Sequence, residues 1–343
     1  MPKRPTLHDL AREAGVSIAT VDRVLNGRAP VREETAKRIY EAAHRIGYHA
    51  ASVIKQRMQA DMPVVHFGFI LQKERQYFYQ RFAEAIAEAV RTAPGVRGIE
   101  TIEFAATSAP DETAALIEKL SGRTNAIAAV SINHHAISTA VQSARERNVP
   151  VFSLLSDFAP GLREAYVGLN NLQIGRIAGW MIAKAARSPG KVAIYVGGHR
   201  WHGHDLREAG FRSYFREHAQ DFHILDTLVN LETRQLTYEA TLDLLHRHPD
   251  LCGLYVAGGG MEGAIAAVRE TRQPDEIALV VNELTPESRA GLQERYVTLV
   301  DATPLPRLCT ELIGLMTHAA LNGVSGTPGQ HFLEPNLYTP ESV

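Results

Sequence analysis

The apolar positions of the first 47 residues recur with the period of an α-helix. Leu7, Leu10, Ala11 and Ala14 stand at the i, i+3, i+4, i+7 spacing that gives a helix one apolar face. A similar spacing returns twice in the residues that follow, through Val21, Val24 and Leu25, and then through Ala36, Ile39, Ala43 and Ile46. Residues 1–47 are therefore predicted to form an all-α unit of three short helices.

Polar residues between these stretches mark where the helices begin and end. Thr6 is a good N-cap with Asp9 at the capping-box position, and Gly15 can adopt the positive φ that ends a helix. The second helix, capped by Ser17, leaves four side chains pointing outward: Ile18, Ala19, Asp22 and Arg23. A short helix of this kind, braced by another helix, fits the major groove of DNA. A three-helix bundle that binds no nucleic acid is the alternative.

From residue 64 onward, apolar runs alternate with amphipathic stretches. The runs that we interpret as strands are 64–71, 126–132, 149–155, 191–196, 251–257, 277–281 and 297–300. Helical periodicity between them is clearest in 82–90, 136–147, 175–186 and 305–321. Runs rich in Val and Ile that alternate with helices favour parallel sheets covered on both faces. The number of runs predicts an α/β core of two doubly wound lobes with a cleft between them.

The charge is distributed unevenly along the 343 residues. Residues 1–60 carry 11 Lys and Arg against 6 Asp and Glu, whereas the remainder carries 25 against 32. A basic head on an acidic body is typical of a modular DNA-binding protein. No N-terminal signal region and no apolar run of transmembrane length are evident, so we expect a cytoplasmic protein. Cys252 and Cys309 form no ligand pair and are expected to be buried and inert.

Residues 6–26 resemble the DNA-binding head of the LacI/GalR family of bacterial transcription regulators. The match departs clearly at Asp22, where the family usually has Ser. The resemblance implies a helix-turn-helix whose DNA contacts come from Thr6, Ser17, Ile18, Ala19, Thr20, Asp22, Arg23 and Asn26. Arg23 is the best candidate for reading a guanine, while Ile18 and Ala19 can contact thymine methyl groups. Asp22 could accept from a cytosine amino group or repel phosphate.

Residues 48–62 link the head to the body. In the LacI family this segment is a hinge helix that orders on specific DNA and inserts an apolar wedge into the minor groove. Arg57 falls where the family places a Leu wedge, and Met58 could serve instead. An Arg facing a narrow minor groove is a workable alternative, and so is a solvated linker without a hinge role.

The body, residues 63–343, resembles the type 1 periplasmic-binding-protein fold that LacI regulators carry, close to its ribose-binding branch. The resemblance lies in residues 149–157, 166–179 and 207–212. It implies two lobes, the first of about residues 63–165 and 290–322 and the second of about 166–289 and 323–343. It also implies that a small molecule, usually a sugar, binds between the lobes to loops at the strand ends.

Sugar recognition needs hydrogen-bonding groups for hydroxyls and an aromatic plate for the ring face. The residues expected to supply them are Phe78, Tyr79, Asn133, Asp157, His204, Arg207, Glu239, Gly259 and Asn282. Neighbours of these, Gln76, Tyr77, Ser156, Tyr238 and Glu283, are further candidates. Arg207 matches the arginine that in the family grips ligand hydroxyls or a carboxylate.

The sequence departs from the family where a sugar-binding Asp commonly follows the strand 251–257. Gly258, Gly259 and Gly260 stand there instead, and glycine N–H groups at a helix start can bind an anion. This favours a ligand with a phosphate or a carboxylate, or one bulkier than a pentose. Residues 258–263 also fit the G-x-G-x-x-G pattern, with Glu283 twenty residues beyond Gly263, so a dinucleotide-binding or enzymatic body remains an alternative.

Histidines cluster at His199, His202 and His204, but no Cys or carboxylate completes a familiar zinc spacing. No nucleophile-and-base pattern or P-loop is evident, so we expect no cofactor, no metal and no enzymatic activity. The predicted function is a ligand-switched, homodimeric transcriptional regulator, by default a repressor. It would bind a near-palindromic double-stranded operator and respond to a sugar, polyol or sugar derivative. A solute-binding protein is a further alternative.

Overall fold

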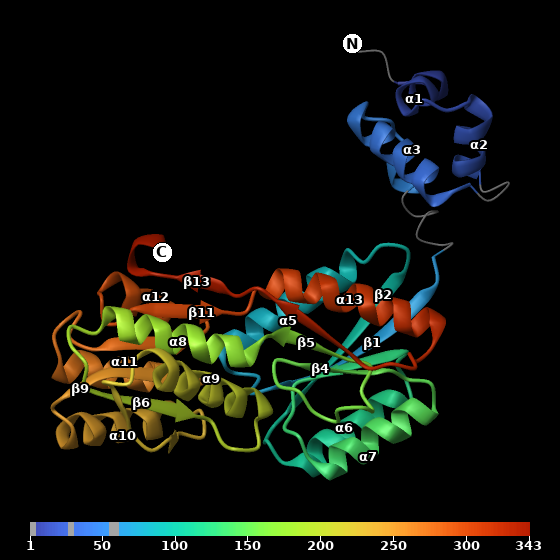
Figure 1. The fold of residues 1–343 in the computed structure, drawn as a ribbon. Helices are drawn as coiled ribbons and strands as arrows, with labels where there is room; N and C mark the ends of the chain where they lie inside the picture. The colour runs from blue at the N-terminus through green and yellow to red at the C-terminus, as the bar shows by residue number, and fades with distance from the viewer. Residues whose placement is uncertain (1–4, 27–30, 55–61) are drawn as a thin grey trace. The chain divides into compact units, whose positions relative to one another are not determined.

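The computed structural model describes residues 5–26, 31–54 and 62–343. The chain forms two compact units, residues 1–65 with 91–99 and residues 66–90 with 100–343. We describe each unit by itself and call residues 5–54 the head and residues 62–343 the body; their elements are labelled in Figure 1.

The head contains the three predicted helices, α1 (Leu7–Ala14), α2 (Ile18–Asn26) and α3 (Glu33–Arg45), and residues 51–54 form a further helical turn. The predicted capping box at the start of α1 is confirmed. The Thr6 hydroxyl accepts from the Asp9 N–H at 3.3 Å, and the Asp9 carboxylate accepts from the Thr6 N–H at 2.9 Å. Gly15 ends α1 with φ of 63°, which a residue with a Cβ adopts only at a cost.

The head core extends beyond the predicted boundary at residue 47. Tyr48 and Ile54 are buried in one cluster with Leu10, Val21 and Ile39. The first residues of the predicted linker therefore pack against the helices of the head, since Ile54 buries a large apolar side chain there. Arg57 and Met58, the predicted wedge candidates, lie outside the described residues.

The first sheet of the body has the strand order β12-β5-β4-β3-β1-β2. Its strands are β1 (Val64–Gln72), β2 (Arg97–Ala105), β3 (Ala126–Ala129), β4 (Val151–Leu154), β5 (Ala165–Leu169) and β12 (Gly329–Leu333). The pairs β1–β3, β3–β4, β4–β5 and β5–β12 are parallel. The helices of this lobe are α5 (Tyr77–Arg91), α6 (Pro110–Ser121), α7 (His135–Glu146) and α13 (Leu305–Asn322).

The second sheet has the order β13-β11-β10-β9-β6-β7, with β8 paired to β6. Its strands are β6 (Lys191–Val196), β7 (His223–Ile224), β8 (Leu228–Val229), β9 (Leu251–Val256), β10 (Ala278–Asn282), β11 (Leu299–Ala302) and β13 (Asn336–Tyr338). The helices of this lobe are α8 (Asn171–Ala185), α9 (His202–His218), α10 (Arg234–Arg247), α11 (Met261–Thr271) and α12 (Pro286–Gln293); the C-terminal turn is 3₁₀ helix η1 (Pro340–Ser342).

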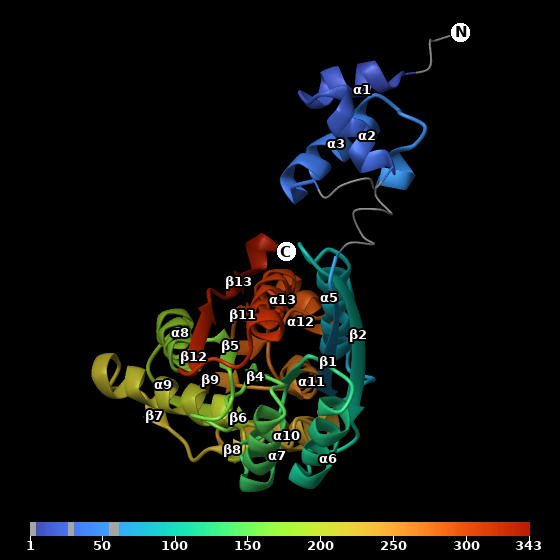
Figure 2. The ribbon, with the colours of Figure 1, turned by 90° about the vertical axis from the view of Figure 1, so that its right-hand side faces the viewer.

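Helices cover both faces of the second sheet, as the alternation of its buried residues requires. Val192 and Ile194 pack with α8 and α9, whereas Ala193 and Tyr195 pack in a separate cluster with α10 and α11. The views in Figures 1 and 2 show α8 and α9 on one side of this sheet and α10 and α11 on the other. The predicted α/β core of two doubly wound parallel sheets is confirmed.

The lobe boundaries differ from the predicted ones because the chain crosses between the sheets three times. β11 was expected in the first lobe, but it pairs with β10 of the second sheet. β12 was expected in the second lobe, but it pairs with β5 of the first. The apolar pattern of a strand shows that it is buried, and it contains no information on which of two similar sheets the strand joins.

Two glycines set the distance between α8 and α9. A Cβ at Gly175 would lie 1.9 Å from the Arg207 carbonyl oxygen, and a Cβ at Gly210 would lie 2.0 Å from the Leu172 carbonyl oxygen. The two helix backbones are therefore in direct contact, which fixes Arg207 on α9 relative to the start of α8.

Across the described ranges, none of the helices combines the length and the apolar character that crossing a bilayer requires.

Candidate functional site

The exposed face of α2 contains the residues predicted to contact DNA. Val21 and Val24 are buried, whereas Ser17, Ile18, Ala19, Arg23 and Asn26 are exposed, Thr20 and Asp22 are half-buried, and Thr6 is exposed at the start of α1. The Thr20 N–H donates to the Ser17 hydroxyl at 3.2 Å, and the Asn26 amide donates to Asp22 at 2.5 Å. Asp22, which replaces the usual Ser, therefore engages Asn26 on the same face.

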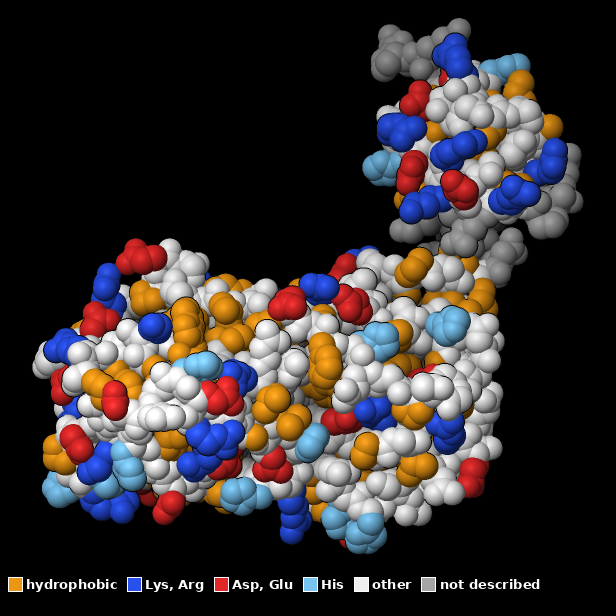
Figure 3. All heavy atoms as spheres, viewed as in Figure 1, with side chains coloured by type: hydrophobic (Ala, Val, Ile, Leu, Met, Phe, Trp, Pro, Cys, Tyr) orange, Lys and Arg blue, Asp and Glu red, His pale blue; other side chains and the backbone are white. Residues whose placement is uncertain are grey.

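Lys and Arg side chains stand on the visible face of the head in Figure 3. Arg23 is the basic residue of α2, in its last turn, and it forms no ion pair with the other described residues. Its guanidinium is exposed and can reach a base edge or a phosphate, which is the chemistry that DNA binding requires.

The body encloses a pocket of about 120 Å³ at the carboxyl ends of strands from both sheets. Its lining residues are Gln76, Tyr77, Phe78, Tyr79, Val130, Leu155, Ser156, Asn171, Trp201, Gly203, His204, Arg207, Glu232, Gly258, Gly259, Met261, Glu262, Asn282, Glu283, Thr285 and Thr303. The segments that follow β1 and β4 supply one wall, and those that follow β6, β8, β9, β10 and β11 supply the other. Open α/β sheets bind ligands at this edge.

Arg207 is buried in the pocket wall, and two hydrogen bonds fix its guanidinium. Nε donates to the Asn171 side-chain oxygen at 2.8 Å, and one terminal nitrogen donates to the Ala257 carbonyl at 2.8 Å. A guanidinium has five N–H donors in a planar fork. The remaining donors are available to a molecule in the pocket.

Glu232 lies at the centre of a network that joins the two lobes. Its carboxylate accepts from Lys73 Nζ at 2.7 Å and from the Gly259 N–H at 3.2 Å, and His204 Nε2 lies 3.7 Å away. Burial by itself raises the pKa of Glu232, but the nearby positive charge and the donated hydrogen bonds hold it below its ordinary value. Lys73 follows β1 of the first sheet, so this ion pair crosses from one lobe to the other.

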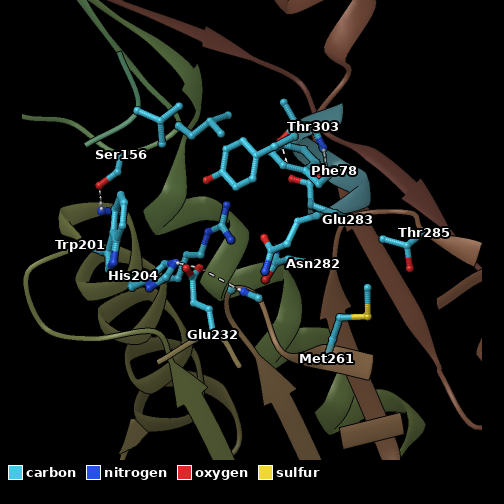
Figure 4. A pocket seen from close by; sticks show the side chains of 18 of the residues that line it. Phe78, Ser156, Trp201, His204, Glu232, Met261, Asn282, Glu283, Thr285 and Thr303 are labelled. Carbon is cyan, nitrogen blue, oxygen red and sulfur yellow. Dashed lines mark hydrogen bonds and ion pairs between the residues drawn. The ribbon is translucent and has the colours of Figure 1, made fainter. Parts of the chain in front are cut away.

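His204 is neutral at neutral pH. Burial lowers its pKa to about 4. Its Nδ1 accepts from the Gly197 N–H at 3.1 Å, which places the proton of the neutral ring on Nε2, facing Glu232. In Figure 4 the side chains of His204 and Glu232 meet on one side of the pocket, with Asn282 and Glu283 across from them.

Two further carboxyl groups line the pocket. Glu283 has a positive φ of 70°, and its carboxylate accepts from the N–H and the hydroxyl of Thr303 at 3.0 and 2.6 Å. Glu262 lies in the first turn of α11, and its side chain forms no hydrogen bond or ion pair with the described residues. Burial raises the pKa of both groups.

A buried polar cluster lies behind Asn282. The Asn282 amide nitrogen donates to the carboxylate of Asp301, which is 1% exposed. The Asn282 side-chain oxygen, the second Asp301 oxygen and the Tyr255 hydroxyl have no partner among the described residues. Burial raises the pKa of Asp301 to about 7.

Both predicted parts of the chain match known families. Residues 6–50 match the family described as "Bacterial regulatory proteins, lacI family", and residues 67–305 match the family described as "Periplasmic binding protein domain". The chain belongs to the periplasmic binding protein domain family and carries a lacI-family head. The resemblance found in the sequence is therefore confirmed, and the chain is a DNA-binding transcriptional regulator with a lacI-family head.

Curated relatives of the regulator include other transcription factors. It is 22% identical to the HTH-type transcriptional regulator GalS of Salmonella typhimurium, over 98% of this chain and 96% of the relative. It is 37% identical to catabolite control protein A of Priestia megaterium over 83 residues, which are 24% of that protein's length. The match to catabolite control protein A of Streptococcus mutans, 48% identical over 50 residues, covers 15% of the relative.

Solved structures that share the fold of the regulator's body include solute-binding proteins. One from Burkholderia graminis, in complex with D-arabinose, has a TM-score of 0.74 and 17% identity, over 82% of this chain and 97% of that chain. One from Actinobacillus succinogenes, with bound D-allose, has a TM-score of 0.73 and 17% identity, over 81% and 98% of the two chains. At this identity the likeness shows the fold.

Six of the nine predicted ligand residues of the regulator line the pocket: Phe78, Tyr79, His204, Arg207, Gly259 and Asn282. Of the further candidates, Gln76, Tyr77, Ser156 and Glu283 also line it. These residues lie at or just beyond the carboxyl end of a strand, or near the start of the helix that follows. They were predicted from these positions together with the resemblance to the family.

Three predicted ligand residues and Tyr238 lie away from the pocket. Asp157 is bound by Arg163, whose two nitrogens donate at 2.5 and 2.7 Å; burial alone would raise its pKa, but these bonds hold it below the ordinary value. Asn133 is exposed and accepts from the Ala159 N–H at 3.2 Å. Glu239 is exposed on α10 and accepts from Gln235, because the helix turns it away from the strand ends. Tyr238 donates to Glu270 at 2.6 Å.

Sequence reasoning missed several lining residues, notably Trp201, Glu232 and Glu262. Glu232 follows β8, which has two residues and leaves no apolar run in the sequence. Leu231 and Glu232 have positive φ values of 49° and 53°, a turn that neither residue type announces. Trp201 lies beside the histidine cluster, and a large aromatic residue in a polar loop was a usable signal.

The glycine loop of the regulator makes room for its own side chains. A Cβ at Gly258 would lie 2.7 Å from the His204 ring, and a Cβ at Gly259 would lie 2.9 Å from the Glu232 side chain. The loop N–H that could bind an anion, that of Gly259, already donates to Glu232. Among residues 5–26, 31–54 and 62–343, no three His, Cys, Asp or Glu side chains are grouped so as to hold a metal ion.

Proposed function

We propose that the regulator is a repressor that acts without catalysis and whose affinity for a near-palindromic operator is switched by a small sugar or polyol in the pocket of the body. We further propose that it acts as a homodimer in the cytoplasm. The observation that carries the proposal is the pocket itself, in which hydrogen-bonding and aromatic side chains from both lobes converge in a chain that also has a lacI-family head.

The side chains of the pocket suit a polyhydroxylated ring. Arg207 supplies free donors, Asn282 supplies a side-chain oxygen without a partner among the described residues, and Phe78 and Trp201 supply aromatic surface. Sugars require this combination, because their hydroxyls both donate and accept while one ring face is apolar. The D-arabinose and D-allose complexes of proteins with the same fold agree with this class of ligand.

The contacts between the lobes suggest how the ligand acts as a switch. Lys73 binds Glu232 at 2.7 Å, and the Gly203 N–H donates to the Ser156 hydroxyl at 3.1 Å, so each contact joins a loop of the first sheet to a segment of the second. A ligand that contacts both walls stabilises one angle between the lobes. In a dimer that angle governs the spacing of the two heads, and the ligand therefore shifts the DNA-competent population.

Operator reading is proposed to depend on Arg23. Replacing Arg23 with Ala should cost roughly 1–3 kcal/mol at one base position and relax specificity there. Arg12 on α1, whose guanidinium is paired with Asp9 at 3.0 Å, provides the matched control, because Arg12→Ala removes the same charge outside α2. Binding is measured by fluorescence anisotropy on operators substituted at each position. An equal loss of affinity on every sequence would show that Arg23 contacts phosphate instead.

The experiment that tests the whole proposal is selection of bound fragments from the source genome with the purified full-length protein, repeated with sugars, polyols and their derivatives. Recovery of a near-palindromic site that a compound releases supports the repressor. If the protein instead binds the site only while a compound is present, that compound is a co-repressor. No enrichment over nonspecific DNA under any condition would reject the proposal.

A further inference from the structure

The pocket is lined by more carboxyl groups than cationic groups. Its described lining includes three carboxyl groups, Glu232, Glu262 and Glu283, and one guanidinium, that of Arg207. His204 also lines it but is neutral at neutral pH, since its Nδ1 accepts a backbone hydrogen bond and burial opposes its charge. Each of these side chains comes from the second lobe, so the acidic character belongs to one wall.

Only one of the three carboxyl groups is bonded to a cation among the described residues. Lys73 binds Glu232 at 2.7 Å. Glu283 is held by the uncharged donors of Thr303, and Glu262 has no bonded partner in the described parts of the chain. Arg207 donates to Asn171 and to the Ala257 carbonyl, and to neither glutamate. Two acidic groups thus border the cavity without a bonded counter-ion.

A second observation points to a hydrogen-bond donor in the ligand. Asn282 lines the pocket with a side chain that is 3% exposed, and its buried side-chain oxygen has no partner among the described residues. A buried acceptor left without a donor is costly, and a ligand N–H or O–H would satisfy it. Asn282 and Glu283 lie on the same side of the pocket in Figure 4, so both acceptors belong to one wall.

The aromatic side chains of the pocket are compatible with a cation. Phe78, Tyr79 and Trp201 line the pocket together with the carboxyl groups. Aromatic faces attract ammonium groups through the ring quadrupole, and Trp is the strongest of the three. An ammonium group also has three donors and no acceptor, which matches a wall of oxygen acceptors.

We infer that the pocket takes a sugar that carries a protonated amine, and that it rejects the phosphorylated and carboxylated derivatives of the same sugar. The inference rests on the proposed function for the location of the ligand. The sequence of the glycine loop suggested an anionic ligand. We infer a cationic one, because the Gly259 N–H is occupied by Glu232 and the same wall carries the three carboxyl groups.

The test is isothermal titration of the full-length protein with matched sets of compounds. Glucosamine, galactosamine and mannosamine are each compared with the parent hexose, the N-acetyl derivative and the 6-phosphate at neutral pH. In at least one set the amine should bind at least tenfold more tightly than its parent, and N-acetylation, which removes the charge, should abolish the gain. Binding of a parent hexose or a phosphate as tight as that of its amine, or no binding by any amine, overturns the inference.

Two glutamates on the same helix make a matched pair of variants. Glu262→Gln removes a pocket carboxylate that has no partner to lose, so folding should be preserved. Glu270→Gln removes the same charge from the exposed end of α11, where the amide can still accept from Tyr238. We expect Glu262→Gln to weaken amine binding about tenfold and binding of the parent hexose much less, and Glu270→Gln to change neither. Equal behaviour of the two variants overturns the assignment of Glu262.

The inference and the proposed function fail in different ways. If a neutral hexose or its phosphate releases the operator and the amines do not, the proposed regulatory function is supported and the inference of an amine ligand is rejected. If the intact protein enriches no operator at all, the proposed function falls, whichever sugar is bound.

Discussion

Replacing Asp301 with Asn should stabilise the protein, and the gain should depend on pH. Asp301 is 1% exposed, and one of its carboxylate oxygens has no partner among the described residues. Asn has nearly the same shape, and its side-chain oxygen can still accept from Asn282. The substitution therefore removes the titrating group while the packing behind the pocket is kept.

The size of the gain in unfolding free energy follows from the proton that Asp301 retains in the folded protein. Burial raises the pKa of Asp301 from 3.8 to about 7, although the charge of Arg207 opposes this. Between those values the unfolded chain has lost the proton and the folded chain holds it, so rising pH destabilises the fold by about 1.4 kcal/mol per pH unit. The loss is complete above pH 7 and amounts to about 4 kcal/mol at most. It is absent well below pH 3.8, where both states are protonated.

The assay is urea unfolding of the wild type and of Asp301→Asn, followed by circular dichroism at several pH values from 4 to 8. Subtracting the two free energies of unfolding at each pH cancels the contributions of the other titrating groups. It should be small at pH 4, rise steadily, and reach about 2–4 kcal/mol in favour of the variant at pH 8. Asp221→Asn, which removes an exposed carboxylate, is the control and should stay within about 0.5 kcal/mol of the wild type.

Parallel pH profiles for the wild type and Asp301→Asn would refute the reasoning. They would mean that Asp301 is ionised in the folded protein, compensated by Arg207 more fully than its burial allows. A variant that is less stable at every pH would show instead that the carboxylate makes a stabilising bond that an amide cannot replace.

Two further predictions concern the contact between the lobes and that between the helices. Lys73→Met should destabilise the body by about 1–2 kcal/mol at pH 7, since Glu232 stays buried without its cation, and the difference should fade at acid pH as Glu232 gains a proton. Lys119→Met, at an exposed pair, is its control in urea unfolding and should cost under about 0.5 kcal/mol. Gly175→Ala should cost about 2–3 kcal/mol, because its Cβ meets the backbone of α9 at 1.9 Å. Gly122→Ala, whose Cβ has 3.8 Å of room, should be close to neutral in thermal unfolding, and equal costs for the two glycines would contradict the close contact.

The sequence predicted most of the buried strands, because burial on both faces requires unbroken apolar runs, but it missed β5, which is buried at every position. β1, β6 and β9 are continuous runs of this kind, and each was found within a few residues. β2 and β12 are partly exposed edge strands of the first sheet, and their mixed composition hides them. Strand detection from a single sequence is therefore a detection of burial, and an edge strand has too little of it.

The candidate site was predictable where a side chain is placed by the strand or helix beside it. Arg207 and Asn282 are of this kind, since one belongs to a helix and the other ends a strand. Asp157 occupies an equivalent position after β4, but Arg163, six residues later, folds back and binds it. That contact depends on the path of a loop, which the alternation of apolar and polar residues does not encode. Glu232 was missed for the same reason.

The two tryptophans of the chain, Trp180 and Trp201, lie in different environments. Trp201 lines the pocket and is 9% exposed, whereas Trp180 lies on α8 and is 45% exposed. The intrinsic fluorescence of the protein is thus the sum of two contributions. Trp201 emits from the pocket wall, where a bound molecule changes its surroundings, and Trp180 emits from a surface in contact with solvent. With Trp180 changed to Phe, a single native fluorophore remains at the site of recognition. Pocket occupancy then becomes an optical quantity that can be followed in real time, on free protein or on protein bound to DNA, without attaching a dye.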